Sequence, residues 1–375
     1  MSSVFNSFNT NTPPRSTFPA VSVIIPLYNT EKYIGACLES ILNQTFQNFE
    51  VIIVDDCSTD NSVAIVESYR EKFGGRLTLS HMEKNSGSGV IPRNKGLNLS
   101  RGEYIFNMDN DDMLTKTALE ELYMLAKNFD ADVVYCEKRF EVNSDGTNLR
   151  VNYNQNGNSN FIDKPTFESE NLAERVQKVS HEAYGRASWT KLVRRNLLIE
   201  NELFFPQCAI ADDTIWSLGL AFYAKKFLRV PNIVYIYRMV EDSLSHKKRT
   251  PEQTINFWFD PLLLGLKTLD KWLGKLEFFR QNPPYQYFVL EFFFRAHFYG
   301  SFQAALQLPP FAVYETIKQA FGQRCGDNDV LISMLSASLN TLQKIHMVNV
   351  QKFNQFAAQA QQRIAQLESE FGKKT

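Results

Sequence analysis

Short β-branched runs alternate with amphipathic segments of helical length through the first part of the sequence. Runs at 21–27, 51–54, 77–82 and 104–108 indicate strands, and segments 31–42, 61–73 and 90–99 indicate helices. A buried parallel strand is a near-continuous apolar run, because helices cover both faces of its sheet. The alternation predicts βαβ units with right-handed crossovers, and so an α/β fold with a mostly parallel sheet flanked by helices.

The pattern continues less regularly to about residue 249. Further helices are expected at 118–129, 171–179 and 215–224, and further strands at 131–137 and 233–238. Thr117 and Glu120 have the spacing of a capping box at the start of the 118–129 helix. The polar segment 143–160, with Asn, Gly and Ser throughout, predicts a mobile loop near a functional site.

Composition divides the chain into three parts. Residues 1–18, rich in Ser, Asn, Thr and Pro, predict a flexible tail and lack the basic start and apolar core of a signal peptide. Residues 19–249 carry the α/β pattern. Residues 250–375 show aromatic-rich helical patterns broken by proline pairs, which predict a mainly α-helical C-terminal domain.

Leu and Phe recur at three- to four-residue spacing in the last segment, 327–371. This periodicity predicts one or two long amphipathic helices. Their apolar face would pack within the chain or join copies of the chain into a homo-oligomer. Peripheral contact with a membrane surface is the alternative.

Composition also limits the class of protein. Hydrophobic residues make up 44% and charged residues 22% of the 375, as in soluble globular proteins. A net charge of −1 provides no field that would attract nucleic acid. Five scattered cysteines without Cys-x-x-Cys spacing argue against a disulfide framework or structural zinc and for a reducing cytoplasm. No apolar run reaches 18 residues, so no transmembrane segment is expected.

Polar residues follow each of the first four predicted strands. They are Tyr28 and Asn29, Asp55 and Asp56, Asn85, and the run Asp109 to Asp112. In open α/β sheets ligands bind at the carboxyl ends of the strands, so these residues predict a nucleotide site along one edge. Asp109 and Asp111 offer the oxygen ligands that phosphate-carrying divalent cations prefer. The alternative is an acidic turn in which Asp112 caps a helix beginning near Met113.

The combined motifs resemble family 2 glycosyltransferases with the GT-A fold. The segments that carry the resemblance are 23–29, 54–60, Asn85-x-Gly87, Arg93-Asn94-x-Gly96, Asp109-x-Asp111-Asp112, Trp189-x-Lys191-Leu192, Asp212-Asp213 and Tyr237-Arg238. They cover residues 21–246 and do not extend into the helical part. The resemblance implies transfer of a hexose or N-acetylhexosamine from a UDP-sugar to a hydroxyl of a glycan or glycolipid acceptor.

The resemblance also implies roles on the donor side. Asp55 or Asp56 would hydrogen-bond the uracil ring, and the backbone near Pro26 and Tyr28 would line the base pocket. The other residues expected to contact the nucleotide-sugar are Asn29, Asn85, Arg93, Asp109, Asn110, Trp189 and Lys191. Asp111, with Asp109, would bind Mn²⁺ or Mg²⁺. His246 is a further candidate ligand of the metal or the diphosphate, because a neutral imidazole suits either.

On the acceptor side the resemblance implies that Asp213 is the catalytic base of an inverting reaction. Asp212 stands where the family usually has Glu and would position the base. Cys57 stands where the family commonly has Gly, which bears on how tight that turn can be. The expected setting is the bacterial cytoplasm, at the inner face of the membrane if the acceptor is lipid-linked.

Each assignment has a plainer alternative. Asp213 could only start a helix, Arg93 and Lys191 could be surface charges, and Trp189 could be core. A sugar-nucleotide nucleotidyltransferase would share the sheet, but the first strand lacks a following Gly-rich, lysine-bearing loop. A non-catalytic glycan-assembly scaffold is the other alternative, although Asp111 and Asp213 are both present.

Overall fold

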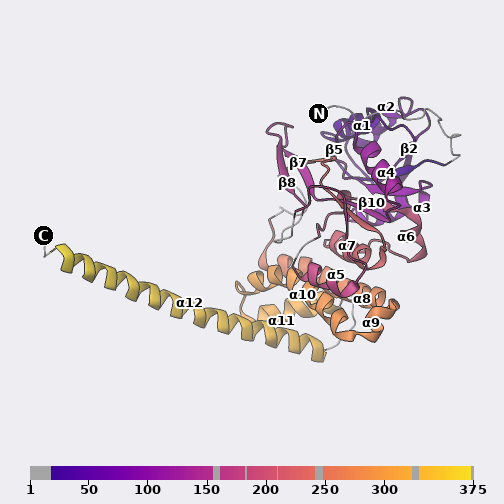
Figure 1. Cartoon of the computed structure of the whole chain (residues 1–375). Coiled ribbons are helices and arrows are strands. Elements are labelled where there is room, and N and C mark those ends of the chain that lie inside the picture. The colour runs from indigo at the N-terminus through magenta and orange to yellow at the C-terminus, as the bar shows by residue number, and fades with distance from the viewer. Residues whose placement is uncertain are drawn as a thin grey trace, which may run out of the picture. The chain divides into compact units, whose positions relative to one another are not determined.

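The computed structural model describes residues 18–372, except 155–160, 182–183, 209, 241–247 and 323–328. Within them, one large sheet has the strand order β3-β2-β1-β4-β10-β6-β11-β9 (Figure 1). Its strands are β1 (Val21–Leu27), β2 (Phe49–Asp55), β3 (Leu77–His81), β4 (Tyr104–Asn107), β6 (Val133–Cys136), β9 (Thr166–Phe167), β10 (Lys191–Arg194) and β11 (Phe227–Val230). The helices of this part are α1 (Ile34–Leu42), α2 (Ser62–Tyr69), α3 (Val90–Leu99), α4 (Ala118–Asn128), α5 (Leu172–Ser180), α6 (Arg195–Glu200) and α7 (Asp212–Tyr223).

The four strands predicted first form the parallel half of this sheet. β1 pairs in parallel with β2 and β4, and β2 pairs in parallel with β3. Every residue of β1, β2 and β4 is buried, as expected for strands covered on both faces. A Cβ at Gly96 of α3 would lie 2.4 Å from Ile24 Cγ2, so only glycine lets this helix approach β1 so closely.

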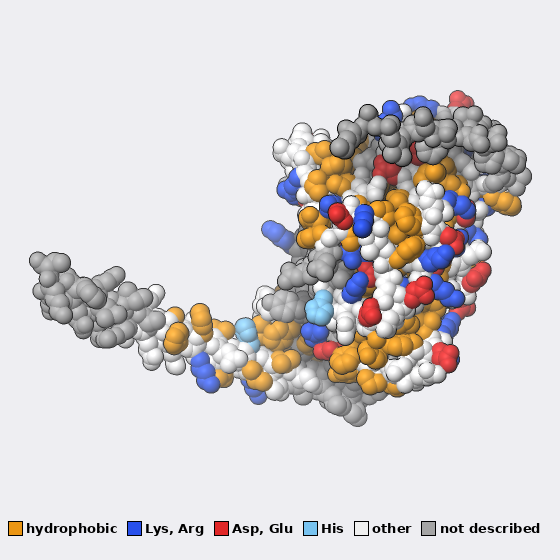
Figure 2. Space-filling model, in the orientation of Figure 1, with side chains coloured by type: hydrophobic (Ala, Val, Ile, Leu, Met, Phe, Trp, Pro, Cys, Tyr) orange, Lys and Arg blue, Asp and Glu red, His pale blue; other side chains and the backbone are white. Residues whose placement is uncertain are grey.

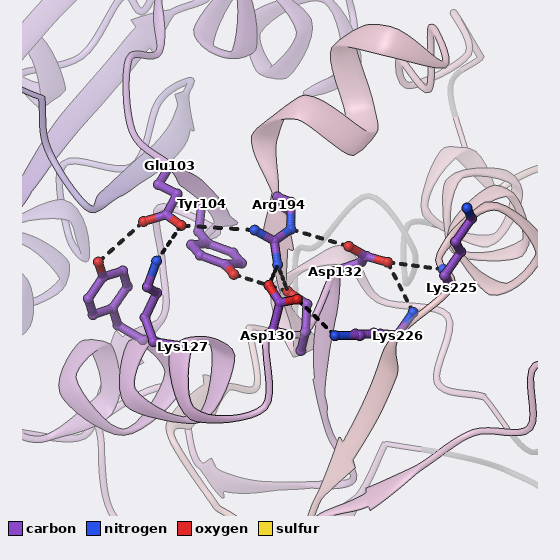
Figure 3. Close-up of polar contacts among 10 residues, drawn as sticks. Glu103, Tyr104, Lys127, Asp130, Asp132, Arg194, Lys225 and Lys226 are labelled. Atoms are coloured by element: carbon purple, nitrogen blue, oxygen red, sulfur yellow. Dashed lines mark hydrogen bonds and ion pairs between the residues drawn. The ribbon is translucent and has the colours of Figure 1, made fainter.

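Strand β10 is inserted antiparallel between β4 and β6. Arg194, its last residue, donates to Asp132 over 3.2 Å and to Asp130 over 2.7 Å. Figure 3 shows this guanidinium between those carboxylates and Glu103, next to Tyr104 of β4. Arg194 therefore connects β10 to residues that precede both of its neighbouring strands, β6 and β4.

A smaller sheet has the order β5-β12-β7-β8. Its strands are β5 (Met113–Leu114), β7 (Lys138–Val142), β8 (Arg150–Tyr153) and β12 (Tyr235–Arg238). One alternative and one expectation are wrong here. The alternative in which Asp112 caps a helix near Met113 fails, because residues 113–114 form β5 and pair with β12. Part of the segment expected to be a loop, 143–160, forms β8, which pairs with β7.

The capping box expected at α4 is absent. Thr117 makes no side-chain cap hydrogen bond; its hydroxyl donates to Glu121 Oε1 over 2.5 Å. Glu120 instead accepts a 2.6 Å hydrogen bond from Thr45. A long-range partner has replaced the local one, which sequence spacing cannot anticipate.

The C-terminal part is helical, as predicted. Its helices are α8 (Pro251–Lys275), α9 (Glu277–Gln281), α10 (Pro283–Ala305), α11 (Pro310–Gly322) and α12 (Asp329–Gly372). The chain divides into two compact units, one comprising residues up to 246 with 265–292, the other 247–264 with 293 onward. The second unit has its own apolar cluster, formed by Ile255, Phe259, Ala304, Ala305, Val313 and Ile317.

Helix α12 is a single helix of 44 residues. Where side chains are described, many of its apolar residues face solvent, and Phe353 and Phe356 are each 70% exposed (Figure 2). No described helix combines the length and apolar composition needed to cross a membrane.

Candidate active site

Loops from the ends of β1, β2 and β3 are joined by hydrogen bonds at one edge of the large sheet. The Asn29 side chain accepts a hydrogen bond from the Thr59 backbone N–H over 2.7 Å. The Asn85 side chain donates to the Asp56 carbonyl over 2.8 Å. The Asn110 amide donates to the Pro26 carbonyl over 2.9 Å. These predicted nucleotide-binding residues therefore lie close together. Some of their polar groups form hydrogen bonds that hold the loops in place.

Asp55 and Asp56 are both 4% exposed and both have protein partners. Asp55 accepts from the Ser58 N–H over 3.0 Å and lies 3.2 Å from His81 Nδ1. Asp56 accepts from the backbone N–H and hydroxyl of Ser86. Asp56 therefore holds the loop that precedes α3, while Asp55 lies at the end of β2. Tyr28, the other predicted pocket residue, is 47% exposed.

The turn after Asp56 contains a strained residue. Cys57 has φ 65°, in the left-handed region where a Cβ is unfavourable. Its thiol donates to the Met82 carbonyl over 3.4 Å. The turn is therefore as tight as a glycine would make it, and the sulfur contact helps hold it.

Arg93 joins two of the predicted acidic groups. Its guanidinium donates to Asp109 Oδ1 over 2.6 Å and to Asp212 Oδ2 over 3.3 Å, although Asp212 lies 119 positions away in the chain. Burial acts to lower the pKa of Arg93, but the surrounding carboxylates, led by Asp109 and Asp213, raise it above its usual value. Arg93 is therefore a largely covered cation, with 11% of its side chain exposed, that balances an acidic cluster, and the surface alternative is wrong.

The acidic turn after β4 is held by Tyr235 and Arg238 of β12. The Tyr235 hydroxyl accepts from the Asp109 N–H over 3.1 Å and donates to Asp112 over 2.7 Å. Asp112 also accepts from the Arg238 N–H over 2.7 Å. Asp112 is thus a structural anchor, which leaves Asp109 and Asp111 at the site.

Helix α7 carries Asp212 and Asp213 in its first turn, after Ala211 in a left-handed conformation with φ 66°. The helix is fixed by close packing: Trp216 stacks on Phe205 with 4.7 Å between ring centroids. A Cβ at Gly219 would lie 2.9 Å from the Trp272 ring. The start of α7 therefore has little freedom to move.

The two neighbouring carboxylates differ in their surroundings. Burial raises the pKa of Asp212 to about 7, with Asp213 adding to the rise and Arg93 opposing it. Asp213 Oδ1 is buried and has no hydrogen-bond partner among the described residues. Asp212 thus accepts a hydrogen bond from Arg93, whereas Asp213 Oδ1 has no such partner among the described residues.

Trp189 and Lys191 are buried behind the site. Trp189 is 7% exposed and stacks on Tyr235 with 4.4 Å between ring centroids. Lys191 Nζ donates to the Gly185 and Ala187 carbonyls, over 2.8 Å each, and to the Thr190 hydroxyl over 2.9 Å. Both residues contact the protein here, so donor contacts of their side chains remain predictions.

The donor set suits a divalent cation that is completed by a substrate. Burial, aided by Asp109, raises the pKa of Asp111 to about 6, and a backbone hydrogen bond opposes the rise. Hard cations with phosphate substrates use one or two carboxylates plus phosphate oxygens and water. No cluster of three His, Cys, Asp or Glu ligands exists among the described residues. Asp111, with Asp109 beside it, fits this kind of site; His246 lies outside the described residues.

Comparison with known proteins agrees with this geometry. Residues 22–200 match the family described as Glycosyl transferase family 2. Glycosyltransferase GlyG of Streptococcus pneumoniae is 32% identical over 235 residues, which cover 60% of this chain and 72% of that protein. The chain belongs to glycosyltransferase family 2. A Bacillus subtilis glycosyltransferase is 35% identical over 225 residues, and the match spans 59% of this chain and 61% of that protein.

Poly(ribitol-phosphate) beta-N-acetylglucosaminyltransferase TarS of Staphylococcus aureus is 32% identical over 219 residues, 58% of this family 2 chain and 35% of TarS. The crystal structure of TarS 1-349 in complex with UDP-GlcNAc superposes with a TM-score of 0.59 at 26% identity. It covers 80% of this chain and 81% of that one. The fold of this family 2 chain is therefore GT-A followed by helices, as the sequence predicts.

Some residues that organise the site were not singled out from the sequence. Tyr235 fixes the acidic turn, and Phe205 lies under Arg93 with 5.7 Å between the guanidinium carbon and the ring centroid. A strand was predicted at 233–238, where the structure has β12 (Tyr235–Arg238), but the direction of the Tyr235 hydroxyl was not predicted. Nothing in the sequence around Phe205 signals its contact with a residue of α3.

Proposed function

We propose that this chain transfers a sugar from a UDP-sugar to a hydroxyl of a glycan acceptor, with inversion at the anomeric carbon. The observation that carries the proposal is the meeting of Arg93, Asp109, Asp212 and Asp213, with the Asp111 carboxylate interacting with Asp109 and Arg93. A UDP-linked donor is supported by TarS, whose crystal structures hold UDP-GlcNAc or UDP.

In this reaction Asp213 accepts the proton of the acceptor hydroxyl as the hydroxyl oxygen attacks the anomeric carbon. The bond from that carbon to the diphosphate oxygen breaks, and UDP leaves on the opposite face. An α-linked donor therefore gives a β-linked product. Arg93 keeps Asp109 and Asp212 in place, so Asp213 is the carboxylate left to act as base.

Asp111, with Asp109, would hold Mn²⁺ or Mg²⁺ on the donor side. A cation bound there would neutralise the charge that develops on the leaving diphosphate. The acidic turn is preformed, because Tyr235 and Arg238 fix its backbone through Asp112. The metal ligands thus need little rearrangement to bind.

The first test is release of UDP from a panel of UDP-sugars, with and without a glycan acceptor. We expect EDTA to abolish release and Mn²⁺ or Mg²⁺ to restore it. Asp111→Asn should weaken UDP binding in the presence of metal and leave the metal-free affinity nearly unchanged, as isothermal titration would measure. Full activity in chelator contradicts the metal assignment. Pyrophosphate formation from UTP and a sugar phosphate would instead indicate a nucleotidyltransferase, and absence of all turnover a scaffold.

We extend the proposal to α12, whose exposed apolar side chains would pair with α12 of a second copy. An isolated helix is marginal in water, and most helical stability comes from packing an apolar face. Phe353, Phe356, Ala360, Ile364 and Leu367 follow one another in steps of three or four residues. Between 341 and 362 the charged residues are Lys344 and Lys352. Two lysines are too few for strong attraction to anionic lipid, and they repel each other too weakly to keep two copies of the helix apart.

Light scattering should therefore find the full chain as an oligomer, and Phe353→Glu with Phe356→Glu should dissociate it. The control is Gln351→Glu with Gln355→Glu, which adds the same charge beside these phenylalanines. A wild type that stays monomeric at all concentrations contradicts the pairing, and monomers that bind phosphatidylglycerol vesicles would place the face on lipid.

A further inference from the structure

The segment from Gly185 to Thr190 accepts three hydrogen bonds from one buried side chain, that of Lys191. Lys191 Nζ uses all of its three donors on this segment, on the Gly185 and Ala187 carbonyls and the Thr190 hydroxyl. Lys191 is 1% exposed, so water does not share in these bonds. Its side chain therefore determines the path of the segment.

The same segment is fastened to α7. Ser217, in the second turn of α7, donates to the Arg186 carbonyl over 2.7 Å. On the other side, the Gly185 N–H donates to the Tyr135 hydroxyl over 2.8 Å. The segment thus links the inserted strand β10 to the helix that carries Asp213.

Charge connects Lys191 to Asp213 as well. Burial lowers the pKa of Lys191 to about 7, and the Asp213 carboxylate acts in the opposite direction. Asp213 Oδ1 is itself buried without a hydrogen-bond partner among the described residues. The three acceptors around Lys191 Nζ match the three N–H donors of an ammonium group.

We propose that Lys191 is a positioning residue that fixes segment 185–190 against α7, the helix that carries Asp213. This inference rests on the proposed function, and it gives Lys191 a role in holding that helix in place of binding the donor. A small pocket of about 20 Å³ lies between the segment and α7, and its lining includes Tyr184, Gly185, Arg186, Thr214, Ser217 and Leu218. Movement of the segment would therefore also change the wall of this pocket.

Two variants change the two sets of hydrogen bonds that hold segment 185–190, those from Lys191 and the one from Ser217 of α7. Lys191→Gln can still donate hydrogen bonds but has no charge. Ser217→Ala breaks the link to α7 and keeps the ammonium. Lys127→Gln, at an exposed lysine paired with Glu103, is the matched control and should behave as wild type.

For Lys191→Gln we expect a severalfold rise in acceptor KM, because an amide has two N–H donors and cannot satisfy all three acceptors of the segment. For Ser217→Ala we expect a rise in acceptor KM in the same direction, because the segment loses its hydrogen bond to α7. UDP affinity should stay within about twofold in both variants, because neither removes a donor contact.

An unchanged acceptor KM with weakened UDP binding in Lys191→Gln would overturn the proposal and return Lys191 to the donor site. Hydrogen exchange provides a readout independent of turnover: amides of 185–190 and of the first turn of α7 should exchange faster in both variants. If the wild type transfers no sugar, the proposed function fails, and unchanged exchange would overturn the positioning role as well. If Lys191→Gln does not fold, the exchange and acceptor KM of Ser217→Ala decide the mechanical role.

Discussion

Asp213→Asn should lower kcat by about 10² to 10⁴-fold while UDP-sugar binding stays intact, because it removes general-base assistance and little else. Asp213 is the carboxylate with an unpartnered oxygen, so its amide analogue breaks no described hydrogen bond of that atom. Initial rates of sugar transfer would give kcat, and titration calorimetry would give the UDP-sugar affinity separately.

The neighbouring Asp212→Asn is the matched control. Asp212 is engaged by Arg93, so its loss should act on position and affinity more than on proton transfer. We expect a smaller fall in kcat and a rise in KM. A dead Asp212→Asn enzyme beside a nearly active Asp213→Asn enzyme would reverse the assignment, and full activity in both would place the base elsewhere.

Arg93→Met should cost about 3–5 kcal/mol of unfolding free energy at pH 8, the range for removing one partner of a buried ion pair. Arg93 is a largely covered cation bonded to two carboxylates, Asp109 and Asp212. Donor binding should also fail, because Asp109 loses the group that orients it. Urea unfolding and UDP titration would measure the two effects.

The pH dependence of this loss has a definite sign. Arg93 lowers the pKa of Asp212 relative to the value it would have in the variant. The stability that the pair contributes is present above that pKa and disappears as pH falls and Asp212 becomes protonated. The difference between wild type and Arg93→Met should therefore be smaller at pH 5 than at pH 8.

Arg101→Met tests whether any lost arginine would do the same. Arg101 also pairs with a buried carboxylate, Glu50 at 2.9 Å, but its own side chain is 62% exposed. Water screens such a pair, so we expect a cost of about 1 kcal/mol or less. A similar loss of unfolding free energy in both variants would contradict a larger contribution from the Arg93 ion pairs.

The parts of the fold that could be predicted from the sequence are those in which an apolar run corresponds to a buried element. Strands such as β1 and β2 are apolar throughout because both faces are covered, and periodicity finds them. Strand β10 was missed: it has four residues, begins with Lys191 and ends with Arg194. Its place in the sheet depends on contacts such as Arg194 with Asp130 and Asp132, which no local pattern reveals.

For the site, motif order was enough to group Arg93, Asp109 and the Asp212–Asp213 pair. Chemistry alone could not decide what each polar group faces. A lysine in a family motif can point its ammonium to a ligand or to its own backbone, and Lys191 donates to the carbonyl of Gly185. Only the folded chain distinguishes these cases, because the acceptors are backbone groups that every sequence possesses.

The insertion of β10 also sets the order in which the sheet can be completed. Strands β1 to β4 pair among themselves using residues 21–107, whereas β6 pairs with β10 and β11, which come from residues 191–194 and 227–230. During synthesis the N-terminal part of a chain emerges and folds first. The parallel strands can thus pair early, while β6 has no partner strand until more than fifty residues later. The carboxylates of α7, and the β12 groups that fix the acidic turn, are made only after residue 211, so the proposed catalytic groups come together after the parallel strands have paired.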